Sequence, residues 1–136
     1  MIIERRDGRL WMLIRTGAGV LWESFSTDYG QTWSLGSPTA IINPGVRFFI
    51  RRLASERLLL INTPDPKLRK GLRAYVSDLQ NETVFSEGLE LDPRDRVSYP
   101  DAVQAPDGYI YAVHDHDRSG VGEILLDVFS EEEILA

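Results

Sequence analysis

The stretch that decides the fold lies near the N-terminus and reads Ser26-Thr27-Asp28-Tyr29-Gly30-Gln31-Thr32-Trp33. Ser and Asp side chains commonly hydrogen-bond backbone groups of their own turn, so Ser26 and Asp28 predict a tight, self-bonded loop. Gly30 permits a backbone conformation that residues with a Cβ resist. The indole of Trp33 has a large apolar surface, which predicts that it is buried between neighbouring sheets. The stretch therefore predicts a structural turn and carries no chemistry itself.

Short strand-like segments extend from this turn along the whole chain. Aliphatic and aromatic residues dominate these segments, while Pro, Gly, Asp and Asn fill the turns between them. The expected strands are 9–15, 20–25, 48–53, 57–62, 72–77, 89–91, 102–105, 109–114 and 123–129. Only the acidic tail 130–135 predicts a helix, which Ser130 would begin in a capping box with Glu133. The pattern predicts an all-β protein.

A turn dipeptide followed by an apolar strand occurs three times, at residues 7–11, 55–59 and 107–111. The separation of roughly fifty residues is the period of a propeller blade rather than of a helical solenoid. The spacing alone leaves open a β-sandwich whose hairpins are similar by coincidence.

Length and composition narrow the class of protein. The 136 residues suffice for one domain, and 43% hydrophobic with 26% charged residues is typical of a folded globular chain. The net charge of −6 argues against a nucleic-acid partner but leaves room for a local basic pocket. The chain contains no cysteine, which excludes disulfides and thiolate chemistry. We find no signal peptide and no apolar run long enough to span a membrane, so we expect no membrane partner and leave the localisation open.

The octapeptide and the repeat spacing together resemble the sialidase (neuraminidase) superfamily, the BNR-repeat or Asp-box β-propellers. Residues 26–33 match the Asp-box pattern Ser-x-Asp-x-Gly-x-Thr-Trp at every defined position. A degenerate second box lies at 77–84, where Leu79, Asn81 and Val84 replace the Asp, Gly and Trp of the pattern. We expect this second turn to be looser and less well anchored.

The resemblance covers nearly the whole chain, and the run 99–111 resembles the closing blade of the family. It implies a partial six-bladed propeller with about two to three four-stranded antiparallel blades. The expected blades lie near residues 1–45, 46–96 and 97–136. Because an incomplete propeller exposes strand edges, we expect either a longer parent protein or a homo-oligomer that completes the ring.

Sialidases cleave terminal sialic acids from glycans, so the resemblance implies a glycan or sugar ligand, no cofactor and no metal. Three arginines of the family bind the substrate carboxylate, an aspartate acts as acid/base, and a tyrosine assisted by a glutamate is the nucleophile. A neutral tyrosine avoids repulsion by the carboxylate on the anomeric carbon. The planar fork of arginine binds both carboxylate oxygens at once. The family is often secreted or periplasmic.

The resemblance assigns site roles to a few residues. Tyr99 stands where the nucleophile would be, and Arg69 where the third arginine would be. Asp101 would orient Tyr99 or a sugar hydroxyl. Arg47 stands where the assisting glutamate is expected and would supply a guanidinium instead, while Asn62 stands in place of the second arginine. The alternatives are a solvated loop arginine at position 69 and a packed strand-entry tyrosine at position 99.

The segment 114–117, His-Asp-His-Asp, raises the question of a metal site. Alternation along a strand places His114 and His116 on one face and Asp115 and Asp117 on the other. Two histidines on one face lack a third ligand, so we expect no metal and a polar strand end that lines the cleft.

Two functions remain open after these assignments. The leading one is a sialidase-like glycoside hydrolase module for terminal sialic acid or a related sugar. It would be divergent or incomplete, because the first arginine, the acid/base aspartate and the assisting glutamate have no counterparts. The alternative is a non-catalytic carbohydrate-binding or scaffold propeller module.

Overall fold

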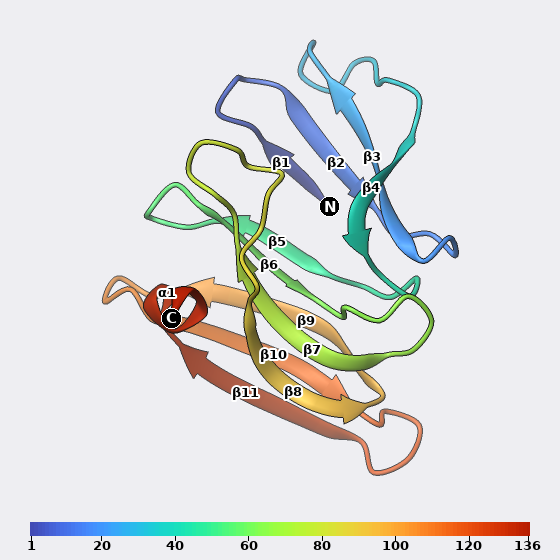
Figure 1. The fold of residues 1–136 in the computed structure, drawn as a ribbon, viewed down its shortest axis with the longest axis vertical. Helices are drawn as coiled ribbons and strands as arrows, with labels where there is room; N and C mark the ends of the chain where they lie inside the picture. Colours follow the sequence, from blue (N-terminus) through green and yellow to red (C-terminus); the bar gives the residue numbers. More distant parts are fainter.

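The computed structural model describes all residues from 1 to 136, and its regular elements are eleven strands and one short helix. The strands form three antiparallel sheets; in Figure 1 the first sheet lies at the top, and the second and third overlap below it. The first sheet contains β1 (Ile2–Glu4), β2 (Leu10–Ile14), β3 (Val20–Ser26) and β4 (Ser37–Ile42). The second contains β5 (Phe49–Arg52), β6 (Leu58–Asn62), β7 (Lys70–Val76) and β8 (Leu89–Asp95). The third contains β9 (Val97–Gln104), β10 (Ile110–His116) and β11 (Glu123–Phe129). The predicted all-β class is confirmed.

Strands β1 and β4 were not predicted from the sequence. β1 has only three residues, and β4 begins with the polar and proline-containing run Ser37-Pro38-Thr39. β4 is an edge strand that pairs only with β3, and a proline is tolerated there because one side of an edge strand makes no ladder hydrogen bonds. Neither strand has the strong apolar pattern on which the prediction relied.

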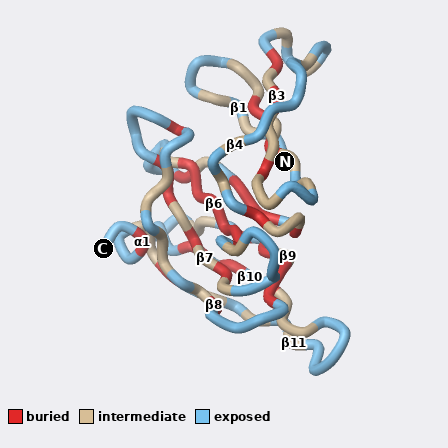
Figure 2. Tube along the Cα trace, turned by 45° about the vertical axis from the view of Figure 1, so that its right-hand side comes forward, coloured by how far each residue is buried: buried red, intermediate tan, exposed pale blue.

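The middle sheet is buried on both faces. All five residues of β6 are buried, and alternate residues point to opposite faces of a strand. Leu58 and Leu60 join a core cluster with Trp11 and Leu13 of the first sheet. Figure 2 shows the buried segments concentrated along the strands of the middle sheet and of β10. The continuous apolar sequence of β6 is thus explained by a sheet on either side of it.

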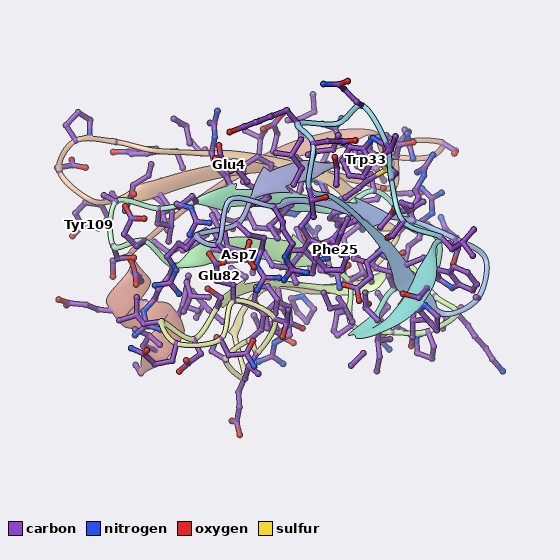
Figure 3. The ribbon with its side chains drawn as sticks, turned by 90° about the horizontal axis from the view of Figure 1, so that it is seen from above. Glu4, Asp7, Phe25, Trp33, Glu82 and Tyr109 are labelled. Carbon is purple, nitrogen blue, oxygen red and sulfur yellow. The ribbon has the colours of Figure 1, made fainter.

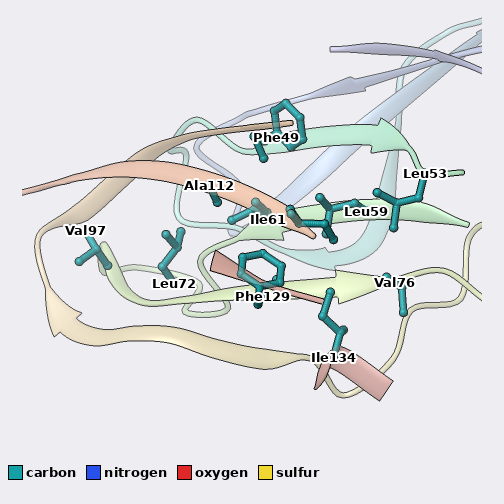
Figure 4. Packing of buried hydrophobic residues seen from close by; sticks show 13 residues of the cluster. Phe49, Leu53, Leu59, Ile61, Leu72, Val76, Val97, Ala112, Phe129 and Ile134 are labelled. Atoms are coloured by element: carbon teal, nitrogen blue, oxygen red, sulfur yellow. The ribbon is translucent and has the colours of Figure 1, made fainter. Parts of the chain in front are cut away.

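The second core cluster joins the second and third sheets (Figure 4). Leu59 and Ile61 of β6 pack there with Ala112 of β10 and Phe129 of β11. The helix α1 (Glu131–Leu135) adds Ile134 to the same cluster. Because these contacts join elements from residue 49 to residue 134, the two sheets and the helix form one packed unit.

The helix begins as the sequence predicts. The Ser130 side chain accepts a hydrogen bond from the Glu133 amide, and the Glu133 carboxylate accepts one from the Ser130 amide at 2.7 Å. This reciprocal capping box satisfies two backbone donors that a helix start leaves unpaired. With five residues, α1 is far too short to cross a lipid bilayer.

The octapeptide folds into the expected self-bonded turn. Ser26 Oγ accepts a hydrogen bond from the Gly30 amide at 2.8 Å, and Asp28 accepts bonds from both the hydroxyl and the amide of Thr32. These bonds, first the one from the Thr32 hydroxyl, lower the pKa of Asp28 to about 2. Gly30 has a φ of +87°, the left-handed conformation that its lack of a Cβ permits.

The expected burial of Trp33 between sheets was wrong. Its indole is half-exposed, donates to the Gly30 carbonyl at 3.0 Å and packs on that glycine within its own turn. The tryptophan that fills the space between the first two sheets is Trp11, which is fully buried and donates to Glu23 at 2.7 Å. The turn is therefore closed by Trp33, while Trp11 carries the packing between sheets.

The degenerate box at 77–84 is attached differently. Val84, which replaces the tryptophan, is exposed, whereas Glu82 is buried. Arg5 Nε lies 2.8 Å from one Glu82 oxygen and Arg52 Nη1 lies 2.6 Å from the other. Figure 3 shows Glu82 beside the Asp7 turn of the first sheet. Instead of an indole, a buried carboxylate between arginines anchors this turn to the first sheet.

Candidate functional site

The backbone at Tyr99 departs from regular strand geometry. In the β9–β10 pairing, Asp101 faces Val113 and Ser98 faces Asp115, so two residues, Tyr99 and Pro100, lie opposite one. This is a β-bulge, a feature that redirects a side chain. Tyr99 has a φ of +54°, which is uncommon for a bulky aromatic residue. Such strained residues cluster at functional sites.

Arginines from three different elements face the Tyr99 side chain. The Arg118 Cζ lies 4.2 Å from the centre of the phenol ring, and the Arg47 Cζ lies 6.0 Å from it. Hydrogen bonding from Arg15, and then from Arg118, lowers the pKa of the Tyr99 phenol below its ordinary value. Arg15 follows β2, Arg47 precedes β5, and Arg118 follows β10. The ends of strands from all three sheets thus meet around one tyrosine.

A polar cavity of about 430 Å³ lies beside Arg118, the arginine that faces the Tyr99 ring. Its lining includes Arg69, Ser98, Asp115 and Arg118. The Ser98 hydroxyl donates to Asp115 at 2.7 Å and accepts from Arg69 Nη1 at 3.5 Å. Arg118 Nε lies 3.3 Å from the second oxygen of Asp115. A chain of polar contacts therefore connects Arg69 to the arginine that stacks on Tyr99.

A separate, mainly apolar hollow of about 680 Å³ lies against Tyr99. Tyr99, Arg15 and Arg47 line it together with Phe48 and apolar side chains of β1 and β2. Tyr99 therefore borders the apolar hollow directly and is connected to the polar cavity through Arg118. This arrangement suits a ligand that carries both an anionic group and an apolar substituent.

Asp101 lies beside the site rather than on the tyrosine. Its carboxylate is 3.8 Å from Arg47, and both side chains are about half-exposed, so the ion pair contributes little to stability. Its other oxygen accepts a hydrogen bond from the Ala102 amide at 2.9 Å. No hydrogen bond joins Asp101, or any other carboxylate, to the Tyr99 hydroxyl.

The predicted site residues are brought together, with two additions. Tyr99 and Arg47 are in contact, and Arg69 reaches the same region through Ser98. The additions are Arg15 and Arg118, which sequence reasoning missed. Arg15 directly follows β2 and Arg118 lies in the turn after β10, and only the stacking of three sheets shows that these segments lie together.

Asn62 lies outside this site. It is buried, donates to the Ile42 carbonyl at 2.7 Å and accepts from Asn43 at 2.8 Å. These bonds attach β6 to the end of the first sheet. Asn62 thus has a structural role, and the guanidinium groups near Tyr99 come from Arg15, Arg47 and Arg118.

The polar strand end 114–117 lines the cavity through Asp115 and Asp117 and not through its histidines. His114 is buried, with Nε2 3.0 Å from Asp92 and Nδ1 3.0 Å from Asp127. It bridges the second and third sheets, because it shares a face with buried Ile110 of the same strand. The aspartate face of the strand lines the polar cavity instead. No group of three or more His, Asp or Glu side chains has the arrangement of a metal site.

A third hollow lies between the first two sheets and has a different character. Its volume is about 290 Å³, and Ile41, Leu60, Tyr75 and Phe85 are among its lining residues. No charged side chain lines it. It offers no partner for an anionic ligand, so the cationic region at Tyr99 is the candidate site.

Comparisons with known proteins point to one superfamily. Residues 1–112 match the family described as BNR repeat-like domain. The intramolecular trans-sialidase from Ruminococcus gnavus, solved with oseltamivir carboxylate, aligns with a TM-score of 0.79 at 25% identity, over 100% of this chain and 33% of that one. The leech intramolecular trans-sialidase, solved with 2,7-anhydro-Neu5Ac, gives a TM-score of 0.79 at 22% identity, over 98% and 23%. The NanB sialidase from Streptococcus pneumoniae gives 0.71 at 19%, over 98% and 23%.

These likenesses confirm the partial propeller and the resemblance from which it was expected. The chain spans a third or less of the length of the solved structures that it matches. No curated protein matches the sequence. Because the family match covers most of the chain and agrees with the fold, the chain belongs to the BNR repeat-like domain family, within the sialidase superfamily of β-propellers.

Proposed function

We propose that the chain forms part of a sialidase-like site that acts on terminal sialic acid, or a related acidic sugar, of glycans. The observation that carries the proposal is the position of Tyr99, in a strained bulge surrounded by arginines from three sheets. The apolar hollow against Tyr99 and the polar cavity beside Arg118 suit a sugar acid with an acylated amino group.

The arginines would bind the carboxylate of the sugar. Arg15 lines the apolar hollow and Arg69 lines the polar cavity, and a guanidinium can bond both oxygens of a carboxylate. Tyr99 would be the nucleophile: its phenol oxygen would form a bond to the anomeric carbon while the bond to the leaving glycan oxygen breaks. Asp101 and Arg47, which lie at the rim of the hollow, would contact sugar hydroxyls.

One observation favours the alternative, a non-catalytic carbohydrate-binding module. No carboxylate hydrogen-bonds the phenol of Tyr99, so no side chain stands ready to take its proton. A site of this kind can bind an acidic sugar without turning it over, because binding needs only the arginines and the apolar wall.

Turnover of a fluorogenic sialoside separates the two functions. Hydrolysis that is lost in Tyr99→Phe, and kept in the matched surface variant Arg9→Gln, supports the hydrolase. Saturable binding of N-acetylneuraminate without turnover supports the binding module. Neither turnover nor binding would overturn both functions. Arg9 is a suitable control because it forms an exposed ion pair with Asp7.

A further inference from the structure

The absence of a carboxylate partner raises the question of what activates Tyr99. We propose that Arg118, held by Asp115, is a positioning residue that fixes the Tyr99 ring and stabilises negative charge on its phenol oxygen. The phenol then becomes nucleophilic without a base on a neighbouring side chain. The inference rests on the proposed role of Tyr99, but its physical content can be measured without any sugar.

Arg118 is fixed by contacts on both sides. Its Nε pairs with Asp115 at 3.3 Å, and the other Asp115 oxygen accepts from Ser98, the residue before Tyr99, at 2.7 Å. One carboxylate thus connects the arginine to the backbone segment that carries the tyrosine. The preceding residue, Asp117, pairs with Arg96 at 2.9 Å and accepts hydrogen bonds from amides of the same turn.

The guanidinium lies close to the face of the ring. At 4.2 Å from the ring centre, Arg118 is within the range of a cation–π contact. That attraction increases when the ring oxygen becomes negative, because the cation then faces a full charge in addition to the ring quadrupole. The contact therefore orients the ring and favours the phenolate over the phenol.

The charges around the phenol are mainly positive. The cationic groups are Arg15 after β2, Arg47 before β5 and Arg118 after β10. The two nearby carboxylates are already paired, Asp101 with Arg47 and Asp115 with Arg118. A further cation, Arg69, lies at the edge beyond Ser98.

The proton released by the phenol would pass to water, because Tyr99 is half-exposed. An opposite charge nearby favours the charged form of a titratable group, which agrees with the lowered pKa of this phenol. Removing the Arg118 charge should therefore make the phenol harder to ionise. It should also release the ring from its stacked position.

Absorbance titration of tyrosine ionisation tests the inference. The chain has five tyrosines, and subtracting the curve of Tyr99→Phe isolates the Tyr99 transition. We expect Arg118→Gln to raise the Tyr99 midpoint by about one pH unit. Arg118→Lys keeps the charge without the planar stack and should restore part of the shift. Arg9→Gln should leave the midpoint unchanged.

A Tyr99 midpoint that is the same in Arg118→Gln and in the wild type, with thermal unfolding showing both folded, would overturn the inference. If Arg118→Gln does not fold, Arg118→Lys decides: a midpoint equal to the wild type would exclude a role for the stacked geometry. Because the titration needs no sugar, a chain that neither binds nor cleaves sialosides can still show the shift. Conversely, turnover with no shift would overturn the role of Arg118 and leave the proposed function intact.

Discussion

Tyr99 adopts an unfavourable backbone conformation, and it lies at the centre of the candidate site. Its left-handed conformation is disfavoured by its own Cβ and by the proline that follows it. The bulge that imposes this conformation also directs the ring toward Arg118 and Arg47. The strain is thus retained where it orients the side chain on which the site depends.

At this position a glycine should therefore be less destabilising than an alanine, because glycine has no Cβ. We expect Tyr99→Gly to have a free energy of unfolding about 1 kcal/mol greater than Tyr99→Ala, since both lack the ring and differ only in the Cβ. Urea denaturation of the two variants measures the difference.

The control is Val103, an exposed residue of the same strand without a positive φ. There the order should reverse, with Val103→Gly less stable than Val103→Ala, because glycine loses more backbone freedom on folding. If Tyr99→Gly were also the less stable of its pair, the bulge would store no strain.

At the scale of elements, the turns that connect the sheets matter as much as the strands. The degenerate box contributes Glu82, whose carboxylate joins the second sheet to Arg5 of the first. Burial alone would raise the pKa of Glu82, but hydrogen bonds from Arg5 and Arg52 outweigh this effect and leave the pKa below its ordinary value. The carboxylate is thus charged and paired in the folded chain.

Glu82→Gln should lower the free energy of unfolding by about 2 kcal/mol at pH 7, because the arginines lose a charged acceptor. The folded-state pKa is depressed, so the stabilisation is fully present above the unfolded pKa of 4.5 and is lost as the pH falls through the folded value. The stability difference between variant and wild type should accordingly shrink at low pH.

Urea denaturation at pH 7 and at pH 3 measures this change. Glu87→Gln is the matched control, since Glu87 is exposed and makes no ion pair, and it should change stability little at either pH. An equal loss in Glu82→Gln at both pH values would mean that the carboxylate charge does not stabilise the turn.

The elements that were predicted correctly from the sequence are those that depend on residues close to one another in the chain. The self-bonded turn at 26–33 and the capping box at Ser130 depend on neighbouring residues, and both are confirmed. The burial of Trp33 depends on how the sheets stack, and this prediction was wrong. The burial of His114 between Asp92 and Asp127 depends on the same stacking and was not predicted. Local patterns specify a turn or a strand, but they do not specify which sheet covers it.

The same reason limited the prediction of the site. Tyr99 and Arg69 were found through the resemblance, whose motifs are contiguous in the chain. Arg15 lies far from Tyr99 in sequence, and Arg118 lies in a different turn. Neither arginine has a distinctive sequence context. Only the meeting of strand ends from three sheets brings them to the phenol.

At the scale of the whole molecule, the fold ends in an exposed apolar face. Ile124, Leu126 and Val128 alternate along β11 and are exposed, as is Val113 of the neighbouring strand. In the rest of the stack, comparable faces are covered by the next sheet. The expectation that a longer parent protein or further copies of this chain complete a propeller stays a prediction.

The charge distribution of the molecule also bears on function. The chain has a net charge of −6, yet Arg15, Arg47, Arg69 and Arg118 gather around one tyrosine. The remaining surface therefore repels anions, while the site attracts them. An acidic sugar bound by this chain should occupy that region and no other.

Titration of N-acetylneuraminate into the isotope-labelled chain, followed by amide chemical shifts, tests this claim most directly. We predict saturable shifts at Arg15, Phe48, Ser98 and Arg118, a roughly tenfold weaker affinity in Arg69→Gln, and no effect of galactose, which lacks the carboxylate. No shift at any concentration, or shifts confined to the uncharged hollow at Leu60 and Tyr75, would contradict the account.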